Sequence, residues 1–394
     1  MSLRELRVFH AATFGHNIGD GALVAGLHAT LAEDLDVTLR VTEDDVLEHK
    51  LAGRTRALTP ERIDRIDATH DLVLIGGGGL MEGGPENRLN GLNYGFDPSC
   101  LERFTIPVVF YAMGFNQFRG ERFHHLDRLR ETLAVARQTS ALVSVRNDHS
   151  KRRLEAALGP CPHVHVIPDP GLWVPTAGVR PLQLQHDALN IVLQLAGDRR
   201  GARFPGRDRW LAFHRATRRR FTWLGRLARA LADLAARRPL NLILCPHVPA
   251  DHALVGQFLD ACPAPLARRH TTSVGMMKGV AQAPAFFDLY RGADAVVGMR
   301  GHSAICAVGA GTPFVGIGSH DKVRGFLDEI GLADRVVEMA AGPDRVVQRL
   351  EALLEDLDGE RRRLVAVRGR LRQVTAAFHA RIGARIGASS ELCV

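Results

Sequence analysis

The sequence predicts an α/β protein made of two doubly wound, parallel-sheet domains that face each other across a cleft. Short apolar runs alternate with helix-length segments along the whole chain, the pattern of a parallel sheet with crossover helices. The pattern stops at a proline-rich stretch that begins at Pro168 and restarts near Leu189. The length of 394 residues also fits two domains, at roughly 100–200 residues per domain.

The first half alternates strand and helix candidates. Short apolar runs predict strands at Leu6–Ala11, Leu72–Ile75, Pro107–Tyr111, Ala141–Val145 and His163–Ile167. Helical spacing predicts helices at Gly21–Glu33, Glu61–Asp67, Phe123–Arg137 and Ser150–Leu158. Prolines at 168, 170, 175 and 181 then predict a linker, because proline cannot continue a regular element. We therefore expect a first domain over residues 1–180.

The second half repeats this order and is expected to form a second domain over residues 181–394. Its predicted strands are Leu189–Leu195, Leu240–Cys245, Ala295–Gly298, Pro313–Gly316 and Arg335–Glu338. Its predicted helices are Phe213–Ala236, Ala250–Asp260, Pro284–Arg291, Ala304–Gly309 and Val323–Ile330. The charged tail Val346–Ile386 predicts one or two closing helices.

Composition limits the class of protein. The formal net charge is +8, and arginine carries most of the positive charge. Such a chain attracts anions, including phosphates, acidic sugars or an anionic membrane surface. The six cysteines form no Cys-x-x-Cys pair, which argues against a zinc or redox motif. The polar start Met1–Glu5 and the lack of an apolar run near the ~20 residues of a membrane span predict a cytoplasmic protein.

The most informative segment runs from Gly298 to Ser303. It places Arg300 and His302 at the carboxyl end of a buried strand, next to the start of a small-residue helix. Ligands of open α/β sheets bind at that edge, and the first amides of a helix favour anions. An arginine, an imidazole and helix amides suit a small anion that needs proton transfer. The alternative is a structural Arg–His pair that closes a loop.

Two glycine-containing segments follow strands of the first domain. Asn17-Ile18-Gly19-Asp20 opens a helix, so its polar residues either contact a ligand or simply cap the helix. Gly76-Gly77-Gly78-Gly79 requires a tight backbone geometry and either cradles a sugar or phosphate or forms a structural turn. We expect substrate contacts from Asn17, Gly19, Asp20, Gly77, Gly78 and Gly79.

Two further cations follow predicted strands. Arg146 ends strand Ala141–Val145, and its planar guanidinium suits a carboxylate or phosphate. Lys322 follows Asp321 at the start of helix Val323–Ile330, one βα unit after His302. An ammonium near a second helix start would gather anions, whereas the alternative is an exposed surface lysine.

Taken in order, these segments resemble the polysaccharide pyruvyl transferase family from about Val8 to Leu332. The matching motifs are Asn17–Asp20, Gly77–Leu80, Val145–Ser150, Asp169–Pro170, Met299–His302, Gly311–Pro313 and Lys322–Leu327. Each motif is weak, but their common order is specific. The chain departs from the family pattern at Gly21, Asn147 and Gly301.

The resemblance implies a GT-B-like fold of two Rossmann-like domains, with the acceptor bound by the first and the donor by the second. It also implies phosphoenolpyruvate as donor and a sugar diol of a polysaccharide precursor or glycoside as acceptor. The products are a cyclic pyruvate ketal and phosphate. By analogy, Arg146, His302 and Lys322 hold the donor, with His302 central to catalysis. We expect Arg300, Ser303 and Asp321 to contribute donor contacts, and no metal, cofactor or nucleic acid to take part.

Two other functions remain open. One is a GT-B glycosyltransferase that uses a nucleotide sugar. The other is a non-enzymatic anion or membrane binder that uses the arginine-rich, aromatic-containing segment Arg199–Arg229. The acceptor of a pyruvyl transferase, which includes a lipid-linked glycan at the inner membrane face, would meet loops of the first domain such as Glu82–Asp97 and Phe115–Gly120.

Overall fold

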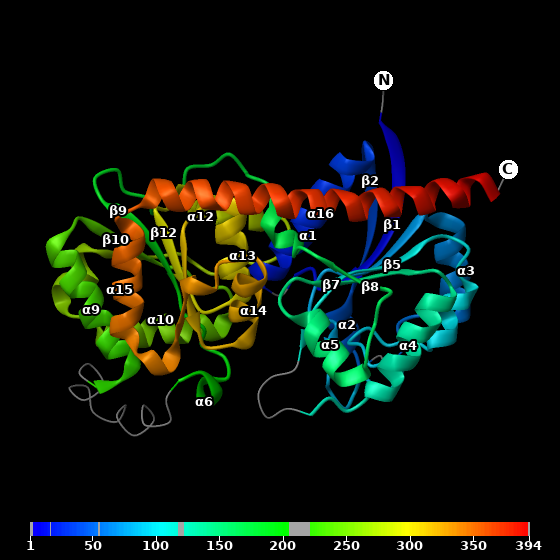
Figure 1. Ribbon diagram of the computed structural model, residues 1–394, viewed down its shortest axis with the longest axis horizontal. Helices are drawn as coiled ribbons and strands as arrows, with labels where there is room; N and C mark the ends of the chain where they lie inside the picture. The colour runs from blue at the N-terminus through cyan, green and yellow to red at the C-terminus, as the bar shows by residue number, and fades with distance from the viewer. Residues whose placement is uncertain (1–2, 16, 54–55, 117–121, 205–220, 393–394) are drawn as a thin grey trace. The chain divides into compact units, whose positions relative to one another are not determined.

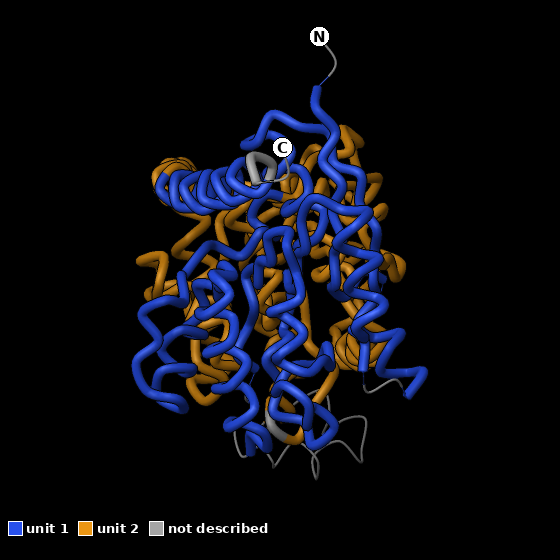
Figure 2. The backbone as a smooth tube through the Cα atoms, turned by 90° about the vertical axis from the view of Figure 1, so that its right-hand side faces the viewer, with its two compact units in different colours: residues 1–15, 23–173, 370–394 blue, residues 16–22, 174–369 orange. Residues whose placement is uncertain are grey.

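The computed structural model describes residues 3–15, 17–53, 56–116, 122–204 and 221–392 (Figure 1). The chain divides into two compact units (Figure 2). Unit 1 comprises residues 1–15, 23–173 and 370–394, and unit 2 comprises residues 16–22 and 174–369. These units differ from the expected ranges 1–180 and 181–394, because the last helix ends in unit 1 and residues 16–22 group with unit 2.

Unit 1 contains a parallel sheet in the order β2-β1-β3-β5-β7-β8. The strands are β1 (Arg4–Ala12), β2 (Val37–Asp45), β3 (Leu72–Gly76), β5 (Val108–Met113), β7 (Leu142–Arg146) and β8 (Val164–Ile167). The short pair β4 (Met81–Glu82) and β6 (Phe115–Asn116) forms a separate parallel ladder. The helices are α1 (Ile18–Leu35), α2 (Val46–Leu51), α3 (Pro60–Thr69), α4 (Leu126–Gln138), α5 (Ser150–Leu158) and the 3-10 turns η1 (Pro98–Arg103) and η2 (Pro170–Trp173).

Unit 2 contains a parallel sheet in the order β11-β10-β9-β12-β13-β14. Its strands are β9 (Leu189–Gln194), β10 (Leu240–Leu244), β11 (Thr271–Ser273), β12 (Ala295–Gly298), β13 (Phe314–Gly318) and β14 (Val336–Glu338). Its helical elements are α6 (Arg200–Arg203), α9 (Trp223–Arg237), α10 (Pro249–Ala261), α11 (Ala264–Arg269), α12 (Ala283–Gly292), α13 (Gly301–Ala310), α14 (Asp321–Glu329), α15 (Pro343–Leu354), η3 (Ala333–Arg335) and η4 (Met339–Ala341). Helix α16 (Leu357–Leu392) closes the chain.

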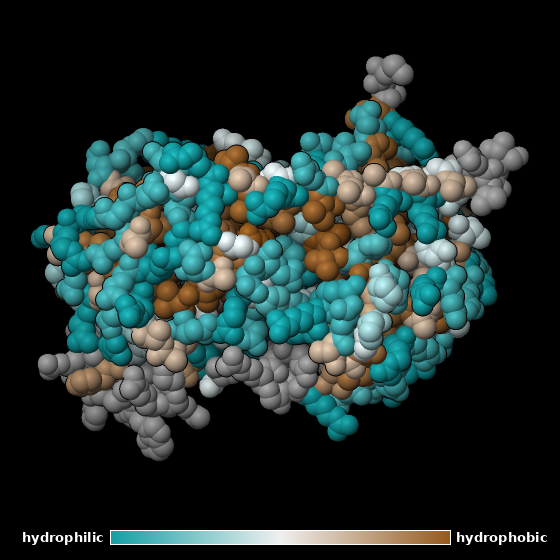
Figure 3. Space-filling view, in the orientation of Figure 1, coloured by the Kyte–Doolittle hydropathy of each residue, from teal (hydrophilic) through white to brown (hydrophobic). Residues whose placement is uncertain are grey.

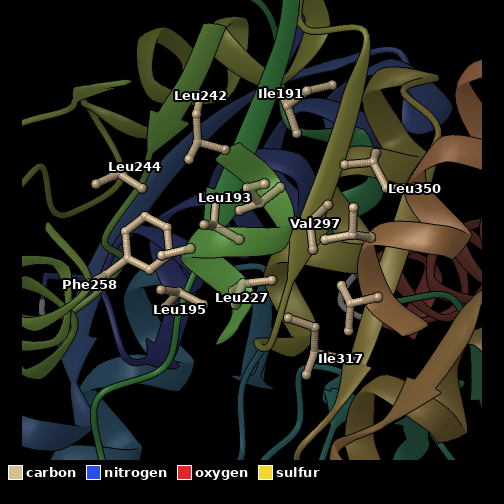
Figure 4. Close-up of a cluster of buried hydrophobic side chains, with 14 of the residues drawn as sticks. Ile191, Leu193, Leu195, Leu227, Leu242, Leu244, Phe258, Val297, Ile317 and Leu350 are labelled. Carbon is tan, nitrogen blue, oxygen red and sulfur yellow. The ribbon is translucent and has the colours of Figure 1, made fainter. Parts of the chain in front are cut away.

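Each unit is held by its own apolar layers. In unit 2, side chains of β9, β10 and β12 pack against α9, α10 and α15, as the cluster around Leu193 and Phe258 shows (Figure 4). In unit 1, one cluster lies around Phe110 and a second around Tyr111. The second cluster includes Phe378 from the last part of α16. On the face seen in Figure 3, hydrophilic residues predominate over the unit 2 helices α9 and α15.

The structure confirms the predicted α/β class with parallel sheets and adds elements that were not predicted. Strand β2 was missed because it lies at a sheet edge and carries Arg40, Glu43 and Asp44 among its apolar residues. The short strand β11 was also missed. Predicted helix Phe213–Ala236 corresponds to α9, which begins at Trp223, and residues 213–220 lie outside the described part of the chain. Among the described helices, none combines the length and the apolar character needed to cross a membrane.

Candidate functional site

The order of the strands identifies one ligand-binding edge in each unit. In unit 2 the order reverses between β9 and β12, where Gln194 pairs with Gly298. In unit 1 it reverses between β1 and β3, where Ala11 pairs with Ile75. Ligands of open parallel sheets bind beyond the carboxyl ends of the strands at such reversals. The turn that carries Arg300 and His302 therefore lies at the ligand-binding edge of unit 2.

The imidazole of His302 lies in the first turn of α13 and is enclosed on one side by the start of α1. A methyl group added to Gly19 would overlap the imidazole ring. The carboxylate of Asp20 faces the same ring, with 4.0 Å between Oδ1 of Asp20 and Nδ1 of His302. Asn17 holds Asp20, because its Oδ1 accepts a hydrogen bond from the Asp20 amide at 2.7 Å and its Nδ2 donates to the Asp20 carboxylate. The structure thus brings the predicted residues Asn17, Gly19 and Asp20 to His302.

The guanidinium of Arg300 is already bound by two carboxylates of unit 2. Its Nε and Nη2 donate to Asp251 at 2.8 and 2.6 Å, and Nη2 also donates to Asp198 at 2.5 Å. Burial lowers the pKa of Arg300, but the hydrogen bonds and charge of Asp251 outweigh burial and raise the pKa above its usual value. Asp198 is shared with Arg203, whose Nη2 donates to it at 3.1 Å. Arg300 is therefore part of an ion-pair network before any ligand arrives.

Asp251 and Gln194 are two polar residues of this edge that the sequence analysis missed. Both are completely buried. The amide of Gln194 donates to Asp251 at 3.1 Å, and its Oε1 accepts from the backbone amides of Met299 and Arg300 at 3.2 and 3.0 Å. Neither residue lies in a motif. The one sequence signal for Gln194 was that it is a polar residue near the end of a predicted apolar strand.

Lys322 and Asp321 lie at the start of α14, after strand β13. The helix is capped by His320, whose Nδ1 accepts from the Lys322 amide at 3.0 Å. A Cβ atom placed on Gly301 would lie 3.9 Å from Cβ of Lys322, so this lysine is close to the turn that carries His302. Asp321 faces Arg324, with Oδ1 and Nη1 3.6 Å apart. The structure therefore brings Lys322 toward the predicted edge.

The hydroxyl of Ser303 is packed between Gly298 and Tyr290. The side chain is buried, and its Oγ lies 3.4 Å from the hydroxyl of Tyr290. A methyl group on Gly298 would overlap the Ser303 hydroxyl. The Ser303 amide donates to the Arg300 carbonyl at 3.1 Å and so closes the turn. These contacts give the Ser303 hydroxyl a packing role, and the expected donor contact from the helix start at Ser303 stays a prediction.

Arg146 is buried in unit 1 between two carboxylates. Its Nη1 donates to Asp169 at 3.1 Å, and its Nη2 lies 3.6 Å from Asp148. Asn147 supports this arrangement because its Oδ1 accepts from the Asp169 amide at 3.0 Å. A methyl group on Gly114 would overlap the guanidinium. Arg146 belongs to unit 1 and His302 to unit 2, so the expectation that they grip one donor together stays a prediction.

The glycine-rich loop after β3 has the tight geometry that four glycines indicate. Gly76 and Gly77 have φ angles of 137° and 77°, which L-residues with side chains rarely adopt. A side chain on Gly79 would overlap that of Asn116, whose Nδ2 donates to the Gly79 carbonyl at 3.2 Å. Among the described residues, a Cβ atom placed on Gly78 would meet only Thr13 Oγ1, at 3.9 Å, although the Gly78 carbonyl accepts from the Gly114 amide at 2.8 Å. Packing therefore explains Gly76, Gly77 and Gly79, while there is room beside the Cα atom of Gly78.

Two histidines lie beneath this loop. Nε2 of His10 donates to the Gly76 carbonyl at 3.2 Å, which leaves Nδ1 to accept from Nε2 of His28 at 2.9 Å. Burial lowers the pKa of His10 to about 3 and that of His28 to about 4. Both rings are therefore neutral at pH 7. Within the described residues, no group of three or more His, Cys, Asp or Glu side chains is arranged to hold a metal ion.

Comparison with solved structures defines the fold class. The chain is similar to a putative UDP-N-acetylglucosamine 2-epimerase from Listeria monocytogenes, with 12% identity, a TM-score of 0.54 and coverage of 92% of this chain and 91% of that one. It is also similar to Anabaena HepE in complex with UDP-glucose, with 12% identity, a TM-score of 0.50 and coverage of 98% and 99%. The glycosyltransferase SnogD from Streptomyces nogalater matches with 14% identity, a TM-score of 0.50 and coverage of 98% and 100%. The protein thus has the GT-B class of fold, with two Rossmann-like domains.

A family comparison gives the more specific result. The model of the polysaccharide pyruvyl transferase family matches residues 17–321. The chain therefore belongs to the polysaccharide pyruvyl transferase family, and the resemblance predicted from its ordered motifs is confirmed. No curated protein matches the chain. Membership of this family makes the protein a transferase of polysaccharide biosynthesis.

Proposed function

We propose that the protein transfers the enolpyruvyl group of phosphoenolpyruvate to two hydroxyls of a sugar and so forms a cyclic pyruvate ketal. The observation that carries this proposal is the position of His302. Its imidazole lies at the ligand-binding edge of unit 2, with the Asp20 carboxylate on one side and Lys322 on the next helix start. An imidazole moves protons near pH 7, and a lysine attracts a doubly charged acid.

The chemistry needs one proton donor and several cations. The methylene carbon of phosphoenolpyruvate gains a proton, and the neighbouring carbon becomes electrophilic. A sugar hydroxyl attacks that carbon and loses its proton. A second hydroxyl then forms the other C–O bond while the bond to phosphate breaks, and its proton leaves with the phosphate. We assign the proton transfers to His302, and general acid–base catalysis of this kind contributes ~10²–10⁴-fold in rate.

The remaining roles follow from charge and position. Lys322 and Arg146 are proposed to neutralise the carboxylate and phosphate of the donor, with Asp321 ordering the start of the helix that carries Lys322. Asp20 faces the imidazole at 4.0 Å and is proposed to stabilise its protonated form. Gly77, Gly78 and Gly79 lie at the strand-order reversal of unit 1, and we propose that the backbone near Gly78 meets the acceptor sugar.

Replacement of His302 tests the proposal directly. We expect His302→Ala to abolish phosphate release from phosphoenolpyruvate in the presence of a sugar acceptor. The exposed His186 provides a matched control, so His186→Ala should release phosphate at the normal rate. Mass spectrometry of the acceptor should show the added pyruvate only with the wild type and the control. Full turnover by His302→Ala would refute the assigned role.

A nucleotide-sugar glycosyltransferase is the alternative function, because the solved structures of HepE and of a Staphylococcus aureus MnaA contain UDP-glucose and UDP. Thermal denaturation separates the two functions. We expect phosphoenolpyruvate to raise the melting temperature and UDP or UDP-glucose to leave it unchanged. Stabilisation by UDP without any effect of phosphoenolpyruvate would favour the glycosyltransferase.

A further inference from the structure

One carboxylate connects the carboxyl ends of three neighbouring strands in unit 2. Asp251 lies in the first turn of α10 and is completely buried. It accepts hydrogen bonds from the amide of Gly197 after β9 at 2.8 Å and from the amide of His247 after β10 at 3.0 Å. It also accepts from the amide of Val248 at 3.3 Å and from the Arg300 guanidinium after β12. Asp251 therefore joins the backbone of two strand ends to the turn that leads into His302.

Asp251 is connected to Arg300 in two ways. Directly, both oxygens of Asp251 accept from the guanidinium, a geometry that fixes the side chain in orientation as well as in distance. Indirectly, Asp251 accepts from Gln194, whose Oε1 holds the amides of Met299 and Arg300. Both the side chain and the backbone of the turn are thus tied to one carboxylate, and His302 follows Arg300 by two residues.

The charge of Asp251 is essential to this arrangement. Burial raises the pKa of Asp251, but the hydrogen bonds and charge of Arg300 outweigh burial and keep the pKa below its usual range. The carboxylate is therefore ionised at neutral pH. An amide in its place would keep part of the hydrogen bonding but would leave the Arg300 charge with Asp198, whose side chain is 32% exposed, as its remaining acidic partner. Such a pair orients Arg300 less firmly.

We infer that Asp251 is a positioning residue for His302: it fixes the turn Gly298–His302 so that the imidazole stays against Gly19 and Asp20. This inference rests on the proposed function, since His302 is assigned its proton transfers there. Asp251 itself is fully buried and contacts Arg300, so it acts through the turn and not on the substrate. A displacement of about 1 Å at a catalytic group costs on the order of 100-fold in rate.

The chain offers a matched control in Asp288. This carboxylate is also buried in unit 2, accepts backbone amides from Ala177 and Val179 at 3.0 and 3.2 Å, and pairs with Arg291 at 2.7 Å. Asp251→Asn and Asp288→Asn therefore each remove a buried negative charge. Of the two carboxylates, Asp251 is the one that contacts the turn of His302. Both variants are compared with the wild type by thermal denaturation and by phosphoenolpyruvate kinetics, well below their melting temperatures.

We expect Asp251→Asn to lower kcat by about 100-fold, with a much smaller change in KM for phosphoenolpyruvate. Asp288→Asn should lower the melting temperature about as much as Asp251→Asn does, but its kcat should stay at the wild-type value. Equal kcat values in the two variants would overturn the inference. Failure of the wild type and Asp288→Asn to turn over phosphoenolpyruvate would instead refute the proposed function.

A second variant and a second readout test the inference even if Asp251→Asn folds poorly. Gln194→Met keeps the volume of the side chain but removes its bonds to Asp251 and to the turn, and we expect a smaller fall in kcat in the same direction. The imidazole NMR signal of His302, assigned with His302→Gln, should shift in both variants and not in Asp288→Asn. An unchanged signal with unchanged kcat in Gln194→Met would contradict the role of this network.

Discussion

The imidazole of His302 lies so close to the backbone of Gly19 that no side chain fits at position 19. This relationship explains why a glycine stands between Asn17 and Asp20, a position that helix capping alone does not restrict. It also links two motifs that are far apart in the sequence, because the start of α1 forms one wall of the site around His302. The orientation of the imidazole therefore depends on both segments.

Substitution of Gly19 should displace His302. We expect Gly19→Ala to lower kcat by about 100-fold, because the ring must move on the order of 1 Å to accept a methyl group. Gly256 in α10 is a suitable control, since a Cβ atom there would meet no atom of another described element within 4 Å. Steady-state kinetics with phosphoenolpyruvate should show normal turnover for Gly256→Ala. Normal turnover by Gly19→Ala would contradict the close packing.

Removal of the Asp20 charge should weaken catalysis without unfolding the protein. Asp20 is partly exposed and faces His302 at 4.0 Å, and we have proposed that it stabilises the positive charge that the ring carries during the reaction. We expect Asp20→Asn to lower kcat by about 10- to 100-fold, within the range of general acid–base effects. The exposed Asp187 provides a control. An equal loss in Asp187→Asn, measured by phosphate release, would show that the effect is not specific to His302.

Gly301 has room for a side chain, in contrast to Gly19. Of the atoms that the structure describes, a Cβ atom there meets only Lys322 Cβ, at 3.9 Å, and the backbone of Gly301 is helical. Alanine at such a position stabilises a protein by about 0.4–1 kcal/mol, so Gly301→Ala should melt at a slightly higher temperature. Gly301→Leu should fill the space beside His302 and Lys322 and weaken phosphoenolpyruvate binding about tenfold, or ~1.4 kcal/mol. Titration calorimetry with Gly256→Leu as control checks this, and tight binding by Gly301→Leu would show that the donor does not use the space.

The sequence predicted the sheets well where strands are buried on both faces. Strands such as β3 and β12 are continuous apolar runs, which is the sequence pattern typical of parallel strands buried on both faces. Strand β2 could not be recognised in this way, because it lies at an edge and is largely exposed. Local pattern therefore located the central strands but not the edge.

The candidate site was predictable only in part. His302 and Lys322 were found because each follows an apolar strand and begins a helix, which is a local signal. The partner of Arg300 was not predicted, because Asp251 lies 49 residues earlier and belongs to no motif. The expectation that Arg300 contacts the donor was based on its charge and on its place at the end of a predicted strand, and the sequence cannot show that two carboxylates already bind that charge. Long-range ion pairs of this kind need coordinates.

The buried pair His10–His28 predicts a loss of stability in mild acid. Burial lowers the pKa of His10 to about 3 and that of His28 to about 4, whereas both titrate near 6.5 when unfolded. Between these values the unfolded chain binds more protons than the folded one, so acid favours unfolding. The contribution of the two neutral rings to the free energy of unfolding is fully present above pH 6.5 and is lost as the pH drops toward 4. Each histidine contributes a slope of about 1.4 kcal/mol per pH unit.

Replacement of His28 should reduce this acid sensitivity. Glutamine does not titrate and can still donate to Nδ1 of His10, as His28 does. We expect the melting temperature of the wild type to fall between pH 7 and pH 5, and that of His28→Gln to fall less steeply because one of the proton-binding rings is gone. The exposed His186→Gln should keep the wild-type slope. Identical slopes in His28→Gln and the wild type, measured by calorimetry over this pH range, would show that His28 is not held neutral in the folded protein.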